Sequence, residues 1–483
     1  MSVLRQIKKN SGIKYDHPAI ISQDIILSYS ELENRIKLLA EHFHSLGIKE
    51  KNKVVILSSN NPHYVLSILA LWEMNACVIP LNTRLADTEL TELIINSDAD
   101  FLLEHKNEKR NLAVNIPKII FPVNSKKRPA EFKAPGINPD EISLIMFTSG
   151  ATGKPRGVMH SLRNLLNSAD NSESFLSQKT SDRWLASLPF FHIGGLSIIT
   201  RTFRFGSTFI IPLSLKNKDL KNAFDFFKPT LASLVSTQLK RLLETGWEPG
   251  PSLKHLLLGG GIIEEGLIKE AISAGCKLSN VYGSTETCAF VTENSGANLA
   301  NKPASAGKAL GNNKIFIVKN KSENLPLQLS GEICIESNSL FHGYYKDEET
   351  TAMKLKDGKY FTGDIGFIDS GGDLIIEARR TDLIISGGEN VNPVEVENIL
   401  NKIPEVKESC VFALEDKEWG QIVAAAIVLD KNISIKDLAE NLKGKIASYK
   451  IPKRFFPVET IPKTPLGKIK REQIREEINL LIN

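Results

Sequence analysis

The chain has 483 residues, of which 42% are hydrophobic and 24% are charged, and this composition is typical of globular proteins. A chain of this length is too long for one hydrophobic core, so we expect two or more domains. The formal net charge of +4 is small for the length and argues against nucleic acid or an anionic membrane as a partner.

Cysteine usage and hydropathy indicate the cellular compartment. The five cysteines are scattered, odd in number and never spaced as Cys-x-x-Cys, so we expect reduced thiols rather than disulfides or a zinc site. Residues 1–10 contain no apolar signal core. The most apolar span, residues 64–81, is interrupted by Glu73 and Asn75, which predicts a buried helix followed by a strand rather than a membrane crossing. We therefore expect a cytoplasmic protein without an integral membrane segment.

Helix and strand patterns alternate through the first two thirds of the chain. Apolar residues at helical spacing predict a helix that begins at Tyr29, and they are Leu32, Ile36, Leu39 and Ala40. Short buried strands are predicted at residues 53–57, 76–81 and 142–147. Such alternation predicts an α/β protein whose large N-terminal domain contains layered α/β subdomains with mainly parallel sheets.

The predicted domain boundary follows a turn-rich segment at residues 363–369. We expect an N-terminal domain at residues 1–378, a hinge at 379–382 and a small, mobile α+β domain at 383–483. In this last domain we predict a strand at residues 383–385, a helix from Pro393, strands at 408–413 and 422–428, and a polar tail at the end.

The segment 148–157, with the sequence TSGATGKPRG, follows the strand predicted at 142–147. Its small residues leave backbone N–H groups accessible, and hydroxyls and cations accompany them, as in loops that hold phosphates. A Walker A loop is excluded because Gly150 and Gly153 are too close together and Pro155 follows the lysine. The alternative is a glycine-rich surface turn. The candidate phosphate ligands are Thr148, Ser149, Gly150, Thr152, Gly153, Lys154 and Arg156.

This loop resembles the signature of the adenylate-forming, AMP-binding enzymes, a family that includes acyl-CoA synthetases, luciferases and the adenylation domains of peptide synthetases. Two positions depart from the family pattern. Ala151 lacks the usual hydroxyl, and Arg156 replaces the usual lysine, which keeps the charge but changes its geometry. Five further segments match the family in order and spacing, so the resemblance covers nearly the whole chain.

Two of these segments carry candidate nucleotide contacts. Residues 256–261 run from a strand into three glycines that let the backbone approach a flat ligand, and in the family this turn borders adenine; the glycines are Gly259, Gly260 and Gly261. In residues 282–287, the resemblance implies that Tyr282 lies on adenine, that Thr285 reaches the α-phosphate and that Glu286 binds Mg²⁺, and Gly283 is a further candidate nucleotide contact. The alternative is a capped helix start at Thr285, and both interpretations can hold at once.

The remaining three segments imply contacts with ribose, with the pantetheine arm of CoA and with the reacting carboxylate. Asp364 and Arg379 would bind ribose hydroxyls. Gly387 and Gly388 would let the pantetheine arm pass, although the same loop is also typical of a tight turn before a helix. Lys468 would contact the reacting carboxylate and the α-phosphate, as implied by its register in the family motif.

The implied activity is that of an AMP-forming acid–thiol ligase, with ATP, Mg²⁺ and CoA as cofactors and cosubstrates. A carboxylate is a weak electrophile, and conversion to an acyl-adenylate supplies a good leaving group. Because carboxylate and ATP are both anions, Mg²⁺ on Glu286, together with Thr285 and Lys468, would neutralise and align them. A rotation about residues 379–382 would then expose the adenylate to the thiol of CoA. No Gly-x-Ser-x-Gly elbow is present in the sequence.

The segment 188–197 bears on the acid. Its sequence LPFFHIGGLS, with Arg201 beyond it, resembles the o-succinylbenzoate–CoA ligases of menaquinone biosynthesis. That substrate has two carboxylates, so Arg201 would bind the second one; the alternative is an ion pair on a helix face. His192 would line the thiol tunnel, or else be a core histidine with a backbone partner.

Other functions remain open at this stage. They are a medium-chain, long-chain fatty or aryl acyl-CoA synthetase and a stand-alone adenylation module of the peptide-synthetase type, which should continue into a carrier segment. A non-catalytic nucleotide-binding relative should have lost Lys468 or Glu286, and both are present. The expected partners are a small carboxylic acid, ATP and CoA. A homodimer is one option for the assembly.

Overall fold

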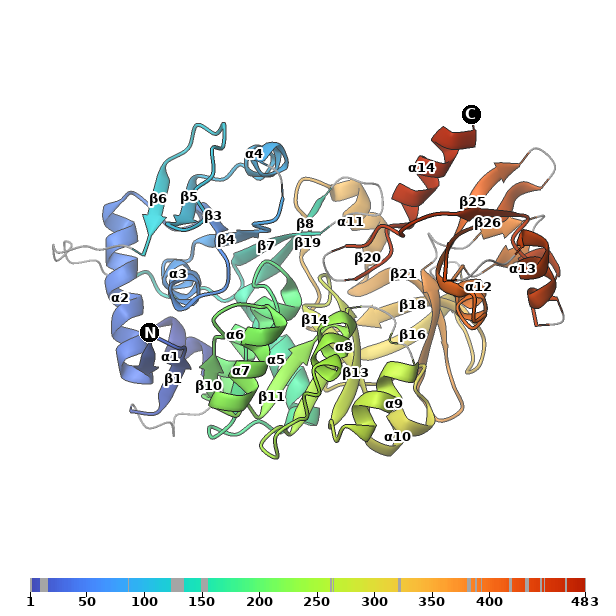
Figure 1. Ribbon diagram of the computed structural model, residues 1–483. Helices are drawn as coiled ribbons and strands as arrows, with labels where there is room; N and C mark the ends of the chain where they lie inside the picture. Colours follow the sequence, from blue (N-terminus) through green and yellow to red (C-terminus); the bar gives the residue numbers. More distant parts are fainter. Residues whose placement is uncertain are drawn as a thin grey trace. The chain divides into compact units, whose positions relative to one another are not determined.

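Figure 1 shows the computed structural model of the chain, coloured from the N-terminus to the C-terminus. The structure describes residues 2–8, 16–85, 87–122, 134–148, 155–260, 263, 265–319, 323–379, 384–386, 389–391, 393–416, 419–430, 434–443, 445–446, 448–464 and 467–482. Contacts divide the chain into two compact units, one made of Met1–Ile315 and Cys334–Phe361 and the other of Phe316–Ile333 and Thr362–Asn483. The expected fold class, a large α/β sheet domain followed by a smaller C-terminal domain, is confirmed.

One sheet of the first unit has the strand order β19-β8-β7-β4-β3-β5-β6. Its strands are Gly343–Tyr344 (β19), Arg156–Ser161 (β8), Ile142–Thr148 (β7), Cys77–Leu81 (β4), Lys53–Leu57 (β3), Phe101–His105 (β5) and Lys118–Phe121 (β6). The strands from β7 to β6 are parallel, whereas β8 and β19 run antiparallel to their neighbours. The three buried strands predicted in this region are confirmed, each to within one residue at either end.

The other sheet of the first unit has the order β15-β14-β13-β12-β11-β9-β10-β1-β2. Its strands are Ser305–Ala309 (β15), Ala289–Ser295 (β14), Leu278–Ser284 (β13), His255–Leu258 (β12), Leu231–Leu234 (β11), Arg183–Leu185 (β9), Thr208–Ile210 (β10), Pro18–Ile21 (β1) and Ile26–Ser28 (β2). The strands from β13 to β1 are parallel, and the strands at both ends are antiparallel. The expectation of mainly parallel sheets is therefore confirmed, and the antiparallel strands are β8 and β19 in the first sheet and β2, β14 and β15 in the second.

Helices connect and cover these strands. They are Val3–Ile7 (α1), Tyr29–Ser45 (α2), Pro62–Glu73 (α3), Asp87–Asn96 (α4), Leu162–Leu176 (α5), Ile193–Phe205 (α6), Asn217–Phe227 (α7), Ser236–Glu244 (α8), Glu265–Ser273 (α9), Gly296–Asn301 (α10) and Glu348–Lys354 (α11). The helix predicted from Tyr29 is confirmed as α2. It begins there because Ser28 and Glu31 form a capping box, in which each side chain accepts a hydrogen bond from the backbone N–H of the other.

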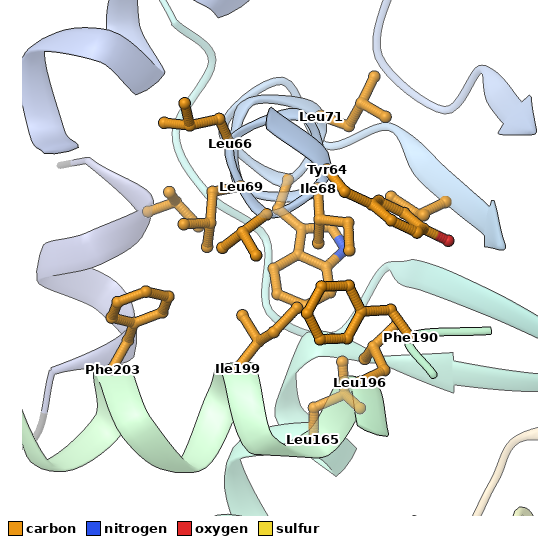
Figure 2. Packing of buried hydrophobic residues seen from close by; sticks show 14 of the residues in the cluster. Tyr64, Leu66, Ile68, Leu69, Leu71, Leu165, Phe190, Leu196, Ile199 and Phe203 are labelled. Carbon is orange, nitrogen blue, oxygen red and sulfur yellow. The ribbon is translucent and has the colours of Figure 1, made fainter. Parts of the chain in front are cut away.

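Both faces of the sheets are buried. In β3, Val54 and Ile56 belong to one hydrophobic cluster, whereas Val55 and Leu57 belong to another on the opposite face. A strand covered on both faces must be apolar at every position, which explains the uninterrupted apolar runs in the sequence. Figure 2 shows part of the first cluster, in which side chains of α3 lie opposite Ile199 and other side chains of α5 and α6.

The second unit contains two groups of strands. The first group has the order β17-β16-β18-β21-β22, and its strands are Glu323–Asn324 (β17), Lys314–Lys319 (β16), Gly331–Glu336 (β18), Lys359–Ile368 (β21) and Leu374–Arg379 (β22). The unit boundaries fall inside β16, β18 and β21, and a short strand, Leu355–Lys356 (β20), pairs with the start of β21. We expected the segment 363–369 to be rich in turns. This prediction is wrong, because β21 extends through most of the segment.

The second group has the order β24-β23-β26-β25, with a further strand beside β26. The elements are Ile384–Ser386 (β23), Glu389–Val391 (β24), Pro393–Leu400 (α12), Val406–Asp416 (β25), Gly420–Leu429 (β26), Ile435–Leu442 (α13), Ser448–Lys450 (a 3₁₀ turn), Arg454–Pro457 (β27) and Arg471–Ile482 (α14). The predicted strands and the helix from Pro393 are confirmed. The predicted polar tail is wrong, because α14 buries Ile474 and Ile478 against one face of β25 and β26.

The predicted boundary and the observed units differ. Residues 316–333 and 362–378 cluster with the C-terminal part, although we expected them in the N-terminal domain. The hinge residues 380–382 lie outside the described residues, so the boundaries 1–378, 379–382 and 383–483 stay predictions. In the part of the chain that the structure describes, no helix is long and apolar enough to cross a membrane.

Candidate active site

The segment that holds Thr285 and Glu286 is a turn between two strands. Tyr282 and Gly283 lie at the end of β13, and the turn leads directly into β14. No helix begins at this point, so the alternative of a helix cap at Thr285 is wrong. Gly283 is required by packing, because a Cβ atom there would lie 1.8 Å from the carbonyl oxygen of Ala289. The sequence Tyr-Gly-Ser-Thr-Glu-Thr therefore encodes a tight connection that presents two polar side chains.

Hydrogen bonds from three directions hold this turn. Each of the four successive carbonyls at residues 285–288 accepts a hydrogen bond from a residue outside the turn. The pairs are His160 Nε2 with Thr285 O at 2.7 Å, Phe341 N with Glu286 O at 2.9 Å, Ser339 Oγ with Thr287 O at 3.2 Å, and Ser168 Oγ with Cys288 O at 2.6 Å. The donors lie in β8, in the segment before β19 and in α5. Because its backbone is satisfied in this way, the turn has a fixed position.

The carboxylate of Glu286 has its own partner. The hydroxyl of Tyr344 donates to Glu286 Oε1 at 2.8 Å. Burial and the neighbouring charge of Glu286 raise the pKa of Tyr344, so the hydroxyl keeps its proton and remains a donor. In proteins Mg²⁺ is commonly held by one or two carboxylates together with phosphate oxygens and water. A single oriented carboxylate at Glu286 fits this kind of site.

The base of the phosphate loop is a pair of antiparallel strands. Thr148 ends β7, Arg156 begins β8, and the two residues are register partners. Thr148 Oγ1 lies 3.5 Å from the carbonyl oxygen of Arg156. The Arg156 side chain lies 3.6 Å from Asp347 and over the ring of Tyr344, at 5.7 Å from its centre. Of the other predicted phosphate ligands, Ser149, Gly150, Thr152, Gly153 and Lys154 lie outside the described residues.

The predicted adenine turn follows β12, next to the strand that carries Tyr282. Gly259 packs closely on β13, since a Cβ atom there would lie 2.9 Å from a methyl carbon of Val281. Gly260 has a positive φ of 88°, which favours glycine. The structure therefore brings Gly259 and Tyr282 to the ends of two neighbouring parallel strands. Gly261 lies outside the described residues.

Helix α6 carries the two candidates on the acyl side. His192 precedes the helix, and burial, together with the charge of Arg84, lowers its pKa to about 4, so the ring is neutral at pH 7. Its carbonyl accepts hydrogen bonds from the N–H groups of Gly195 and Leu196. Gly195 permits this geometry, because a Cβ atom there would lie 2.1 Å from the carbonyl oxygen of Pro189.

Arg201 is a buried cation. Its side chain lies in α6 with 1% of its surface exposed, and Nη2 donates to Ser197 Oγ at 2.9 Å. The guanidinium carbon lies 4.4 Å from the ring centre of Phe290 and 5.8 Å from that of Trp184. Among the described residues, Nε has no hydrogen-bond partner and no carboxylate forms an ion pair with this group. Burial lowers the pKa of Arg201 to about 10, so the group still carries its charge at pH 7.

The remaining candidates lie in the second unit. Asp364 in β21 and Arg379 in β22 are register partners, and Asp364 N donates to Thr362 Oγ1 at 3.0 Å. Lys468 is exposed in a tight connection, where its carbonyl accepts a hydrogen bond from Thr464 N at 2.7 Å. Gly387 and Gly388 lie outside the described residues. The roles of these residues stay predictions.

No pattern in the sequence indicated several of the residues that hold the turn. His160 and Tyr344 are examples, since they are separated from their partners by 125 and 58 positions along the chain. Ser168 and Ser339 are ordinary polar residues in the sequence. Only the pairing of β8 with β19, and the packing of α5 on β14, place these side chains at the turn.

Comparison with known families shows to which family the chain belongs. Residues 8–345 match the family model described as AMP-binding enzyme, and residues 395–468 match the model described as AMP-binding enzyme C-terminal domain. The chain belongs to the AMP-binding enzyme family. The first match contains the phosphate loop, the adenine turn and the turn at Thr285, and the second ends at Lys468.

Several members of this family are similar over their full length. The chain is 34% identical to a 2-succinylbenzoate–CoA ligase of Bacillus licheniformis, over 97% of this chain and 98% of the relative. It is similar to the structure of the o-succinylbenzoate CoA synthetase of Bacillus subtilis in complex with the acyl-adenylate intermediate, with 31% identity, a TM-score of 0.90 and 98% of both chains covered. The same enzyme in complex with ATP and a magnesium ion gives 30% identity and a TM-score of 0.88, over 98% of this chain and 99% of the other.

The contact of Tyr344 with Glu286 generates a prediction. Tyr344→Phe removes only the hydroxyl, and we expect the Mg²⁺ concentration needed for half-maximal adenylation to rise about tenfold, since a hydrogen bond to a charged group contributes ~1.5–3 kcal/mol. Calorimetric titration with Mg·ATP should show the same loss of affinity. The control is Tyr345→Phe, whose hydroxyl contacts Asp98 and Lys53 instead. An unchanged Mg²⁺ requirement in Tyr344→Phe would contradict the orienting role.

Proposed function

We propose that the chain is an ATP-dependent, AMP-forming acid–CoA ligase and that its acid is 2-succinylbenzoate, in menaquinone biosynthesis. The observation that carries this proposal is the full-length similarity to ligases and ligase structures for this acid, at 31–34% identity. The oriented carboxylate of Glu286 and the buried cation of Arg201 support it. They match the two chemical demands of the reaction, charge neutralisation at ATP and recognition of a second carboxylate.

In the first half-reaction a carboxylate oxygen of the acid attacks the α-phosphorus of ATP. The bond to the β-phosphate breaks, and pyrophosphate leaves. We assign Thr285 and Lys468 to the α-phosphate and the attacking carboxylate, and Glu286 to Mg²⁺, which would supply positive charge at the phosphates. The phosphate loop holds the leaving pyrophosphate, with Arg156 at the base of the loop.

In the second half-reaction the thiol of CoA attacks the carbonyl carbon of the acyl-adenylate. The bond to AMP breaks, AMP leaves, and the thiol proton is released. We assign Gly387 and Gly388 to the passage of the pantetheine arm and a neutral His192 to the wall of the thiol tunnel. A rotation about residues 379–382 would withdraw Lys468 before this step.

We assign recognition of the acid to Arg201. In this proposal the succinyl carboxylate is activated and the ring carboxylate binds Arg201. A buried cation without a carboxylate partner is costly, and the ring carboxylate would supply the missing charge. The aromatic rings of Phe290 and Trp184 beside the guanidinium suit an aryl substrate.

The setting of the enzyme is part of the same proposal. We place it in the cytoplasm, which agrees with five buried cysteines that form no disulfide. A homodimer stays a prediction. Neither point is needed for the chemistry of the site.

A pyrophosphate-release assay tests the function. With ATP, Mg²⁺ and CoA, we expect AMP and pyrophosphate to form together with an acyl-CoA. The values of kcat/KM should be highest for 2-succinylbenzoate, lower for an arylbutyrate that lacks the ring carboxylate, and lowest for medium-chain fatty acids. ADP and phosphate as products would sink the adenylate mechanism. If a fatty acid gave the highest kcat/KM, the protein would be a general acyl-CoA synthetase instead.

Arg201→Leu tests the recognition of the second carboxylate. We expect kcat/KM for 2-succinylbenzoate to fall about a hundredfold or more, because a buried carboxylate that loses its partner costs ~3–5 kcal/mol. The arylbutyrate should change far less. Arg204→Leu is the matched control on the same helix, since Arg204 pairs with Asp170 at 2.7 Å and should not affect the ratio between the two acids. If Arg201→Leu lowered kcat/KM by the same factor for both acids, the residue would have only a structural role.

Lys468→Ala separates the two half-reactions. Adenylation should fall about a hundred- to thousandfold, the usual result of removing one charge-stabilising donor. Thioester formation from supplied acyl-adenylate should remain close to that of the wild type, because the lysine is withdrawn in the second conformation. Lys470→Ala, two positions away in the same exposed segment, is the control. An equal loss in both half-reactions would be inconsistent with two conformations.

A further inference from the structure

His160 is a buried histidine for which the reaction described above has no use. It lies in β8, four positions after Arg156, and has none of its surface exposed. Its Nε2 atom lies 2.7 Å from the carbonyl oxygen of Thr285. The side chain thus reaches from the strand that leaves the phosphate loop to the turn that presents Thr285 and Glu286.

The direction of this hydrogen bond follows from its acceptor. A carbonyl oxygen can only accept, so Nε2 carries the proton and donates. Burial lowers the pKa of His160 to about 4, so at pH 7 the ring is neutral and Nδ1 is unprotonated. Among the described residues Nδ1 has no hydrogen-bond partner. Among the described residues, the hydrogen bond from Nε2 to the Thr285 carbonyl is therefore the one hydrogen bond of this ring.

The strand pattern places several relevant side chains on the same face. Successive side chains alternate along a strand, so Arg156 and His160 point to the same side of β8. Tyr344 is the register partner of Val158, which lies between them, and therefore shares this face. From this face Tyr344 contacts the Glu286 carboxylate and His160 contacts the Thr285 carbonyl. The paired strands β8 and β19 thus connect the base of the phosphate loop with both residues of the turn.

A direct chemical role does not fit the surroundings of His160. Its donor is committed to a backbone carbonyl, and the side chain is fully buried. Its position instead sets the backbone of Thr285, whose side chain is assigned to the α-phosphate. Small displacements matter at such a point, since alignment of attacking and leaving groups contributes much of the rate in transfer reactions.

We propose that His160 is a positioning residue for adenylation, and that its Nε2–H bond to the Thr285 carbonyl fixes Thr285 and Glu286 relative to the strand that leaves the phosphate loop. This inference rests on the proposed function, because the roles of Thr285 and Glu286 belong to it. It adds a residue that does not touch the substrate and acts only through the turn.

Two amide substitutions distinguish the effect of losing the hydrogen-bond donor from the effect of losing the imidazole ring. The side-chain nitrogen of glutamine reaches to about the position of Nε2, whereas that of asparagine reaches only to the position of Nδ1. His160→Gln keeps the donor to Thr285, and His160→Asn and His160→Leu lose it. We expect kcat for pyrophosphate release to fall about ten- to hundredfold in the last two variants, the cost of a displacement on the order of 1 Å. His160→Gln should stay within about threefold of the wild type.

A positioning role is identified by which kinetic constants change, and in which of the two half-reactions. The KM for ATP should change little in His160→Asn, because phosphate binding is retained while alignment is lost. Thioester formation from supplied acyl-adenylate should also be preserved, whereas a globally damaged protein would lose both half-reactions. Wild-type kcat in His160→Asn would overturn the proposal. An equal loss in His160→Gln and His160→Asn, with unchanged thermal midpoints, would overturn it as well.

A second measurement tests the contact between His160 and Thr285 even if the variants do not fold or the wild type is inactive. In ¹⁵N-histidine-labelled wild-type protein, one ring should show the Nε2–H tautomer and stay neutral down to about pH 5, and its signals should be absent in His160→Gln. A protonated ring or the opposite tautomer at pH 7 would overturn the inference. If the wild type releases no pyrophosphate with any acid, the proposed function fails, while the tautomer still reports on the contact with Thr285.

Discussion

Burial of the central strands on both faces is the constraint on which the rest of this molecule depends. In β3 alternate residues enter different hydrophobic clusters, and Leu256 and Leu257 in β12 do the same. Such strands have no face left for polar chemistry. The candidate nucleotide contacts of the first unit therefore lie where strands end. The base of the phosphate loop lies between β7 and β8, the glycine turn follows β12, and Thr285 follows β13.

The same burial creates a second requirement at the strand ends. A turn that enters the interior carries carbonyl groups that water cannot reach, and each of them needs a donor from the protein. At residues 285–288 these donors are neutral side chains and one backbone N–H, so the donors themselves add no charge beside the candidate phosphate and Mg²⁺ contacts. The requirement of burial and the requirement of precise positioning are met by the same hydrogen bonds.

Local signals in the sequence were sufficient for much of the fold. The helix at Tyr29 was predictable because a capping box and an apolar stripe coincide there, and β3 was predictable because a doubly buried strand is apolar throughout. Helix α14 was missed because Ile474 and Ile478 are its only buried apolar residues and its other positions read as a solvated tail. Strand β21 was missed because its glycines favour turns locally, while pairing with β22 keeps the segment extended.

For the candidate site, too, some residues were predicted from the sequence and others were missed. Thr285, Glu286 and Arg201 were predicted as site residues from short motifs and from the family resemblance. Their supports were not found, because His160 and Tyr344 act across strand pairs that no local pattern reveals. The structure also changed the interpretation of two candidates. Thr285 lies in a strand-to-strand turn rather than at a helix cap, and Arg201 is buried without a described carboxylate partner.

The burial of every cysteine has a consequence for an enzyme that uses a thiol substrate. An exposed protein thiolate would exchange with oxidised CoA and form a mixed disulfide, which would block the site or trap one conformation. Burial raises the pKa of Cys288, in the turn at residues 285–288, to about 12, and that of Cys276 to about 11, so almost no thiolate forms at these two residues at neutral pH. Since all five thiols are buried, we expect none of them to exchange readily with CoA disulfide or to be oxidised readily by peroxide.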